Sequence, residues 1–149
     1  MKAVDFLSRD NVLFEVEAAN KIELLQELSR LAASAVDLPA DQIFSALHKR
    51  EQLGSTGMGQ GIALPHARFA ELKRPFGLLA RLKHPIMFDA IDEQHVDIVF
   101  LLLLPASPQG EQLNALALVA RRLRDPQIVS DIRRAAGPAN LYHSFAQKT

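Results

Sequence analysis

Cysteine is absent from the 149-residue sequence. Its absence excludes disulfide bonds, thiolate nucleophiles and zinc sites built from cysteine ligands, and it is compatible with a reducing compartment. A chain of this length can bury a sizeable apolar core without disulfides or metals. We therefore expect one domain over residues 1–149.

Net charge is also absent, since Lys and Arg total 17 and Asp and Glu total 17. Without an overall positive field, the chain has no general attraction for nucleic acid or for an anionic membrane. Either partner would require a local basic patch. We expect neither a nucleic-acid partner nor direct insertion into a membrane.

Long apolar runs are absent as well. The longest is IVFLLLLPA, Ile98 to Ala106, which has about half the length that a membrane-spanning helix requires. Near the N-terminus, Asp5 and other polar residues interrupt the continuous apolar stretch that a secretory signal needs. We therefore expect a cytoplasmic protein.

Two helices are predicted in the first third of the chain. Asn20 and Glu23 have the spacing of a capping box, and apolar residues repeat at helical spacing over the following residues 21–36. A second helix is expected to begin after Pro39 and to stop at Gly54, because glycine suits a helix C-terminus.

Strands and further helices follow. Four apolar segments are predicted to be strands: VLFEVEA, GIALPHA (ending near Pro65), FGLLARLK and VDIVFLLLL. The last two run almost without polar alternation, as buried strands do. Helices are expected over EQLNALALVARRLR, over PQIVSDIRRAA with Asp125 as its N-cap, and over ANLYHSFAQ. This order predicts an α/β fold, an α+β sandwich with a mixed central sheet flanked by helices.

The most distinctive pattern lies between residues 50 and 68. Four of the chain's seven glycines fall within residues 54–61, and His66 follows a proline soon after them. A P-loop would need a lysine after its last glycine, and a dinucleotide fingerprint would need a glycine where Ile62 stands. A nucleophile elbow would need a glycine where Leu53 stands. None of these three motifs fits.

Residues 54–61, called the glycine segment below, can expose successive backbone N–H groups that form an anion-binding concavity. A neutral imidazole is a good nucleophile near pH 7, so His66 beside such a concavity can accept a phosphoryl group. The N–H groups and Arg50 would stabilise charge on the phosphoryl oxygens. The alternative is that the glycines form an ordinary turn and that His66 is a surface residue.

The four remaining histidines lack the spacing that holds a metal ion; they are His48, His84, His95 and His143. Arg50 and backbone N–H groups can neutralise a phosphoryl group without a metal. We therefore expect no metal and no other cofactor.

The stretch REQLGSTGMGQGIALPHAR, residues 50–68, resembles the active-site signature of the enzyme IIA components of the phosphotransferase system, fructose/mannitol class. It is most similar to their nitrogen-regulatory branch. The resemblance covers nearly the whole chain and includes HPIMFDAIDEQHVDIVFLLLLPA and LALVARRLRDP. It implies a mixed α/β fold and a single EIIA type-2 domain over residues 1–149.

The resemblance implies a phosphocarrier. His66 would accept a phosphoryl group at Nε2 from the phosphohistidine of a small HPr-like protein, and Arg50 would lie near it. We expect Ser55, Thr56 and Gly57 to donate hydrogen bonds to the phosphoryl oxygens.

Three functions follow from the resemblance. In the nitrogen-regulatory branch the phosphorylation state is itself the signal, and regulatory proteins of nitrogen or potassium metabolism read it; we favour this function. The alternative is a sugar-specific IIA component that passes phosphate to the IIB domain of a fructose or mannitol permease. The second alternative is a non-catalytic regulatory module that has lost phosphotransfer and acts by docking alone.

Gln112 marks a departure from the family pattern, which usually has a second histidine at the start of this helix, near the phosphorylated one. A glutamine amide can donate a hydrogen bond to a phosphate oxygen, but it cannot be protonated. We predict that His66 still accepts phosphate and that onward donation is impaired.

Overall fold

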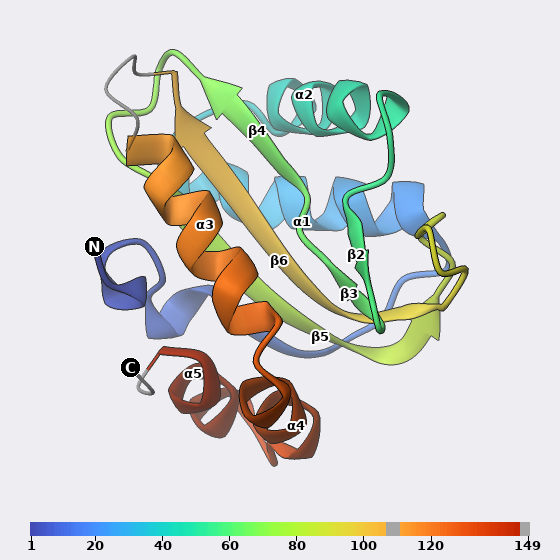
Figure 1. The fold of residues 1–149 in the computed structure, drawn as a ribbon. Helices are drawn as coiled ribbons and strands as arrows, with labels where there is room; N and C mark the ends of the chain where they lie inside the picture. The colour runs from blue at the N-terminus through green and yellow to red at the C-terminus, as the bar shows by residue number, and fades with distance from the viewer. Residues whose placement is uncertain (107–110, 147–149) are drawn as a thin grey trace.

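A mixed six-stranded β-sheet forms the middle layer of the protein (Figure 1). The computed structural model describes residues 1–106 and 111–146, without the side chains of Glu111 and Gln112. The strands are β1 (Val12–Val16), β2 (Gly57–Gly59), β3 (Ile62–Ala63), β4 (His66–Phe69), β5 (Phe76–Ile86) and β6 (Val96–Pro105). Their order is β1-β5-β6-β3-β2, and β4 also pairs with β6. Parallel and antiparallel pairs both occur, which confirms the predicted mixed sheet.

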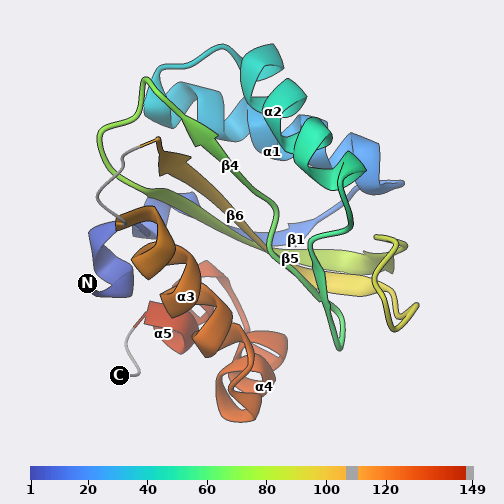
Figure 2. The same cartoon turned by 45° about the horizontal axis from the view of Figure 1, so that its top comes forward.

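Helices cover both faces of the sheet (Figure 2). One face carries α1 (Lys21–Val36) and α2 (Ala40–Gln52), and the other carries α3 (Glu111–Leu123), α4 (Pro126–Arg134) and α5 (Pro138–Ala146). Two short 3-10 helices, Ala3–Asp5 and Arg9–Asn11, precede β1. The predicted sandwich of helices around a central sheet is confirmed.

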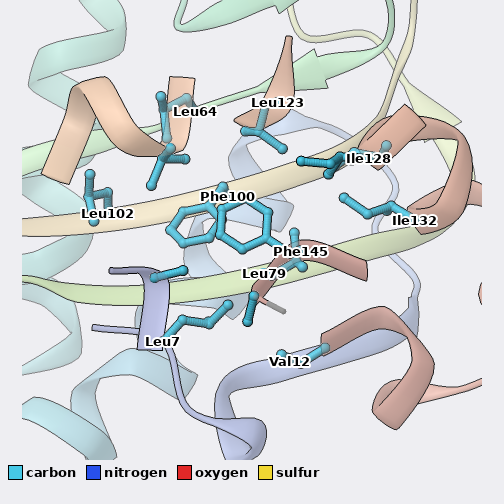
Figure 3. Close-up of a cluster of buried hydrophobic side chains, with 14 of the residues drawn as sticks. Leu7, Val12, Leu64, Leu79, Phe100, Leu102, Leu123, Ile128, Ile132 and Phe145 are labelled. Atoms are coloured by element: carbon cyan, nitrogen blue, oxygen red, sulfur yellow. The ribbon is translucent and has the colours of Figure 1, made fainter. Parts of the chain in front are cut away.

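Burial on both faces explains why β5 and β6 are apolar over most of their length; the exceptions are Arg81, Lys83 and His84 in β5 and Asp97 in β6. Phe100 and Leu102 of β6 point to the side of α3–α5, where Phe100 packs on Phe145 with ring centroids 4.9 Å apart (Figure 3). Val99 and Leu101, one position away, pack with α1 and α2 on the opposite side. Successive strand residues face opposite sides, so a stretch that is buried on both faces has apolar residues at successive positions.

The predicted helix starts are confirmed in detail. The Asn20 side chain accepts a hydrogen bond from the Glu23 N–H at 2.9 Å, and the Glu23 carboxylate accepts one from the Ala19 N–H at 3.2 Å. The reciprocal bond of this capping box thus reaches one residue earlier than in the usual pattern. Asp125 caps α4 through the Gln127 N–H at 2.9 Å.

The chain around Pro65 differs from the prediction of one strand ending there. β3 stops at Ala63 and β4 begins at His66, and both run parallel to β6. Proline has no N–H to donate to a neighbouring strand. Its carbonyl accepts from the Leu102 N–H at 2.9 Å, which holds the two short strands on the same side of β6.

The glycine segment supplies strand β2 and the turn of a β-hairpin with β3, where the sequence predicts a loop before the strand. β2 pairs antiparallel with β3, with Gly59 opposite Ile62. The turn residues Gln60 and Gly61 have φ angles of +58° and +84°, as a two-residue type I′ turn requires. β5 also continues through Pro85 to Ile86, beyond the end of the predicted strand FGLLARLK.

Candidate functional site

His66 is the first residue of β4, and its ring orientation is defined by a backbone contact. Its Nδ1 lies 2.8 Å from the Leu64 carbonyl oxygen. A carbonyl oxygen only accepts hydrogen bonds, so Nδ1 carries the proton. The lone pair of the neutral ring is therefore on Nε2, the nitrogen that the family resemblance implies as the acceptor.

A cleft of about 660 Å³ opens beside this ring. Its lining residues come from the end of α2, from β4, from β6 and from α3; they are Ala46, Lys49, Arg50, Gln52, Leu53, His66, Ala67, Arg68, Leu104, Leu113 and Leu116. Among these described residues are three cations, Lys49, Arg50 and Arg68, and no carboxylate. We call this region the His66 cleft. Its charge favours an anionic occupant.

The pKa of His66 is lowered from its ordinary value of 6.5. The main cause is burial of the ring, which disfavours the charged form, and the Arg50 and Arg68 cations lower the pKa further. The hydrogen bond to the Leu64 carbonyl and the charge of Glu51 act in the opposite direction. At pH 7 the imidazole is neutral, which is the state a nucleophile requires.

Arg50 is the predicted cation of the site, and it lies in the last turn of α2. It lines the same cleft as His66. Its Nη1 donates to the Gly54 carbonyl at 2.8 Å, which ties the guanidinium to the start of the glycine segment. A guanidinium has five N–H donors, so this bond leaves capacity for an anion in the cleft.

The Ser55 and Thr56 hydroxyls and the Thr56 and Gly57 N–H groups donate within the protein. The Ser55 hydroxyl donates to the Phe88 carbonyl at 2.7 Å and accepts from the Gly57 N–H at 3.0 Å. The Thr56 hydroxyl and N–H both donate to the Glu51 carboxylate. Donation from these three residues to a phosphoryl group stays a prediction, and it would require these bonds to exchange.

Gln112 lies in the first turn of α3, and its side chain is outside the described part of the structure. The helix that carries it borders the His66 cleft through Leu113 and Leu116. Proximity of the Gln112 amide to His66 stays a prediction.

Sequence reasoning missed Lys49 and Arg68. Arg68 follows His66 by two positions on a strand, so the two side chains share a face. This two-residue spacing is visible in the sequence and could have identified Arg68. Lys49 and Leu53 are four residues apart at the end of α2 and so lie on one helix side. Which helix side faces the cleft depends on how α2 packs, which the sequence alone does not reveal.

Residues 1–106 and 111–146 contain no group of three or more His, Cys, Asp or Glu side chains that could hold a metal ion. None of the helices in these ranges has both the length and the apolar character needed to cross a membrane.

The family model described as "Phosphoenolpyruvate-dependent sugar phosphotransferase system, EIIA 2" matches residues 5–148. A "Nitrogen regulatory protein" of Bradyrhizobium diazoefficiens is 38% identical over 146 residues, which are 98% of this chain and 95% of the relative. Another of that name from Escherichia coli is 42% identical over 137 residues, which are 91% of this chain and 84% of the relative.

Among solved structures, the crystal structure of nitrogen regulatory protein IIA-Ntr from Neisseria meningitidis is similar with a TM-score of 0.90 and 30% identity. The match covers 95% of this chain and 97% of that one. The fold and the sequence thus resemble the same kind of protein over nearly the full length.

Proposed function

The chain belongs to the EIIA 2 family of the phosphoenolpyruvate-dependent sugar phosphotransferase system, and we propose that it is a phosphocarrier of the nitrogen-regulatory kind that acts through His66. One observation carries the choice of acceptor: the hydrogen bond from Nδ1 to Leu64 leaves the ring's lone pair on Nε2, beside a cleft bordered by three cations. Positive charge near the nucleophile compensates the negative charge of the phosphoryl oxygens as the group approaches His66.

The proposed step is a displacement at phosphorus. The Nε2 lone pair of His66 forms a new N–P bond while the N–P bond of the donor's phosphohistidine breaks, and the electron pair of that bond returns to the donor ring. The Nδ1–H of His66 stays on the Leu64 carbonyl, which stabilises the positive charge that the ring gains. The phosphoryl group moves without an added proton or metal.

The supporting residues divide into two groups in this proposal. Arg50, Lys49 and Arg68 compensate the charge of the phosphoryl oxygens. Ser55, Thr56 and Gly57 keep the glycine segment in place, and they reach the phosphoryl group if their present bonds exchange. Gln112 would donate its amide hydrogen bond to a phosphate oxygen without sharing charge.

The partners we propose are an HPr-like protein as donor and regulatory proteins as readers of the phosphorylation state. Two considerations favour regulatory proteins over a IIB domain as the next partner. The relatives called nitrogen regulatory protein match over most of their own length. The family pattern that the sequence resembles usually has its second histidine where Gln112 stands, and a glutamine there disfavours onward transfer. We further propose that residues 1–149 form one EIIA domain.

Phosphate labelling tests the proposal. The purified protein is incubated with labelled phosphoenolpyruvate, enzyme I and an HPr-type carrier, beside the variants His66→Ala and Gln112→His. His143→Ala, which removes an exposed histidine on α5, is the matched control. We expect acid-labile phosphate on the wild type and on His143→Ala, and none on His66→Ala.

A second stage adds a IIB domain from a fructose or mannitol permease. We expect Gln112→His to lose its label to IIB faster than the wild type does. If the wild type loses its label to IIB as fast as Gln112→His does, the sugar-specific function is favoured. A wild type that takes no label at all would leave the docking module as the remaining function.

A further inference from the structure

A buried ion pair lies behind the glycine segment and takes no part in the proposed displacement. Glu51 on α2 and Lys21 at the start of α1 are 2.8 Å apart, and their side chains are only 3% and 14% exposed. Lys21 Nζ also lies 3.3 Å from the Phe88 carbonyl oxygen and 4.6 Å from the centroid of its ring. Burial of two charges carries a desolvation cost that pairing often only balances, so such a pair is a poor device for stability alone.

Glu51 holds the glycine segment as well as Lys21. Its carboxylate accepts the Thr56 N–H at 3.0 Å and also accepts the Thr56 hydroxyl, and Thr56 is buried. Charge-assisted hydrogen bonds are stronger and more directional than neutral ones. Two of them from one residue, with Lys21 on the other side, fix the position of the Thr56 peptide.

Thr56 in turn holds the residue that contacts the imidazole. Its carbonyl accepts the Leu64 N–H at 3.0 Å, and the Leu64 carbonyl accepts from His66 Nδ1 at 2.8 Å. Leu64 lies in the short link between β3 and β4 and belongs to neither strand. An unbroken series of hydrogen bonds therefore runs from Glu51 through Thr56 and Leu64 to the ring of His66.

We infer that Glu51, held by Lys21, is a positioning residue for His66: through Thr56 and Leu64 it keeps the ring in the Nδ1–H tautomer. The effect on phosphotransfer rests on the function proposed above, whereas the effect on the tautomer does not. Movement of Leu64 would weaken the bond at Nδ1, and the ring would then populate the tautomer whose Nε2 carries the proton and cannot attack.

Four variants test the inference. Thr56→Val removes the hydroxyl with little change of shape, and Thr56→Ser retains it. Glu51→Gln removes the buried negative charge. Glu17→Gln is the matched control, because Glu17 pairs with Lys83 at 3.2 Å on the surface, with side chains 68% and 48% exposed.

The first measurement is the pair of ¹⁵N chemical shifts of the His66 ring at a pH where the ring is neutral. The second is the rate of phosphoryl transfer at saturating carrier. We expect a single Nδ1–H tautomer in the wild type, Thr56→Ser and Glu17→Gln. We expect mixed tautomers in Thr56→Val and Glu51→Gln, with transfer about 10- to 100-fold slower, as for other small displacements of reacting groups.

Folded Thr56→Val and Glu51→Gln proteins with one tautomer and unchanged rates would overturn the inference, and the pair would then serve only the fold. If Glu51→Gln does not fold because Lys21 loses its buried partner and is left with the exposed Asp89 at 3.8 Å, the double variant Lys21→Met/Glu51→Gln removes both charges and gives the same decision. If the tautomer shifts but no protein accepts phosphate, the positioning role stands and the proposed function fails.

Discussion

At the scale of single residues, the charge state of His66 is controlled by the groups around its ring. Burial lowers its pKa below 6.5, and the two arginines of the cleft add to this effect. We therefore predict that the ring titrates below 6.5 in an NMR pH series, and that Arg68→Gln raises the midpoint. The rate of phosphoryl acceptance should stay constant as pH falls to about 6.5 and decrease only below it. A midpoint at or above 6.5 would contradict the assigned environment.

The same shift gives His66 a pH-dependent contribution to stability. The folded protein binds a proton on this ring less readily than the unfolded chain does, so the contribution is fully present above pH 6.5. It is lost as the pH falls from 6.5 to the lower folded pKa. Unfolding free energies of the wild type and His66→Gln should therefore differ by a constant amount above pH 6.5, and the wild type should weaken relative to the variant below it.

At the scale of elements, the hairpin of β2 and β3 depends on Gly61. Its φ of +84° is unfavourable for other residues, and a Cβ there would lie 2.6 Å from Arg133 Nη2 and 3.0 Å from Asp97 Oδ1. Arg133, on α4, pairs with Asp97 at 2.9 Å and donates to the Gln60 carbonyl at 2.7 Å. These two contacts, called the Arg133 clamp, hold the hairpin turn against α4. A side chain at Gly61 would strain the turn and displace this clamp.

We predict that Gly61→Ala lowers the free energy of unfolding by about 1–3 kcal/mol, measured by urea denaturation. Gly137→Ala is the matched control, since a Cβ at Gly137 meets no atom within 4 Å and its φ is not in the left-handed region. We expect the control to change stability by no more than about 0.5 kcal/mol. Equal losses in both variants would show that the Arg133 clamp and the turn conformation do not matter.

The hairpin also shows why sequence reasoning failed where it did. Glycine has a low strand propensity, so Gly57 and Gly59 predict a loop, yet they pair in a local hairpin with β3, which the distant strand β6 holds in the sheet. The helices were predictable because caps such as Asn20 and apolar spacing act within a few residues. The central position of the sheet between helices was predictable because β5 and β6 are apolar on both faces over most of their length, and its mixed character because strands and helices intersperse along the chain.

For the proposed site, the local sequence signals predict His66 and Arg50, whereas the tertiary fold brings in the remaining groups that line the cleft. Leu113 reaches the cleft from α3, and Lys49 reaches it from α2. These helices cover opposite faces of the sheet and are far apart in sequence (Figure 2). The buried role of Thr56 was also beyond reach, because its acceptor Glu51 becomes a buried carboxylate only when α1 supplies Lys21.

At the scale of the whole molecule, the His66 cleft lies beside β4 and is lined from both helical layers, by α2 from one face of the sheet and by α3 from the other. Two leucines at this place are exposed, Leu53 by 85% after α2 and Leu113 by 57% on α3. A carrier that brings its phosphohistidine to His66 must cover this region. Exposed apolar residues next to the three cations of the cleft form the kind of patch that a protein partner buries.

We predict that Leu53→Ser raises the KM for the phosphorylated carrier about 10-fold, a loss of about 1.4 kcal/mol in binding, and leaves the maximal rate unchanged. Ile91→Ser is the control: Ile91 is 96% exposed, but it lies in the loop between β5 and β6 and does not line the cleft. Added salt should raise KM for the wild type, because Lys49, Arg50 and Arg68 attract an anionic donor through a screened field. If Ile91→Ser raises KM as much as Leu53→Ser does, the carrier docks over a wider or different face than the one around His66.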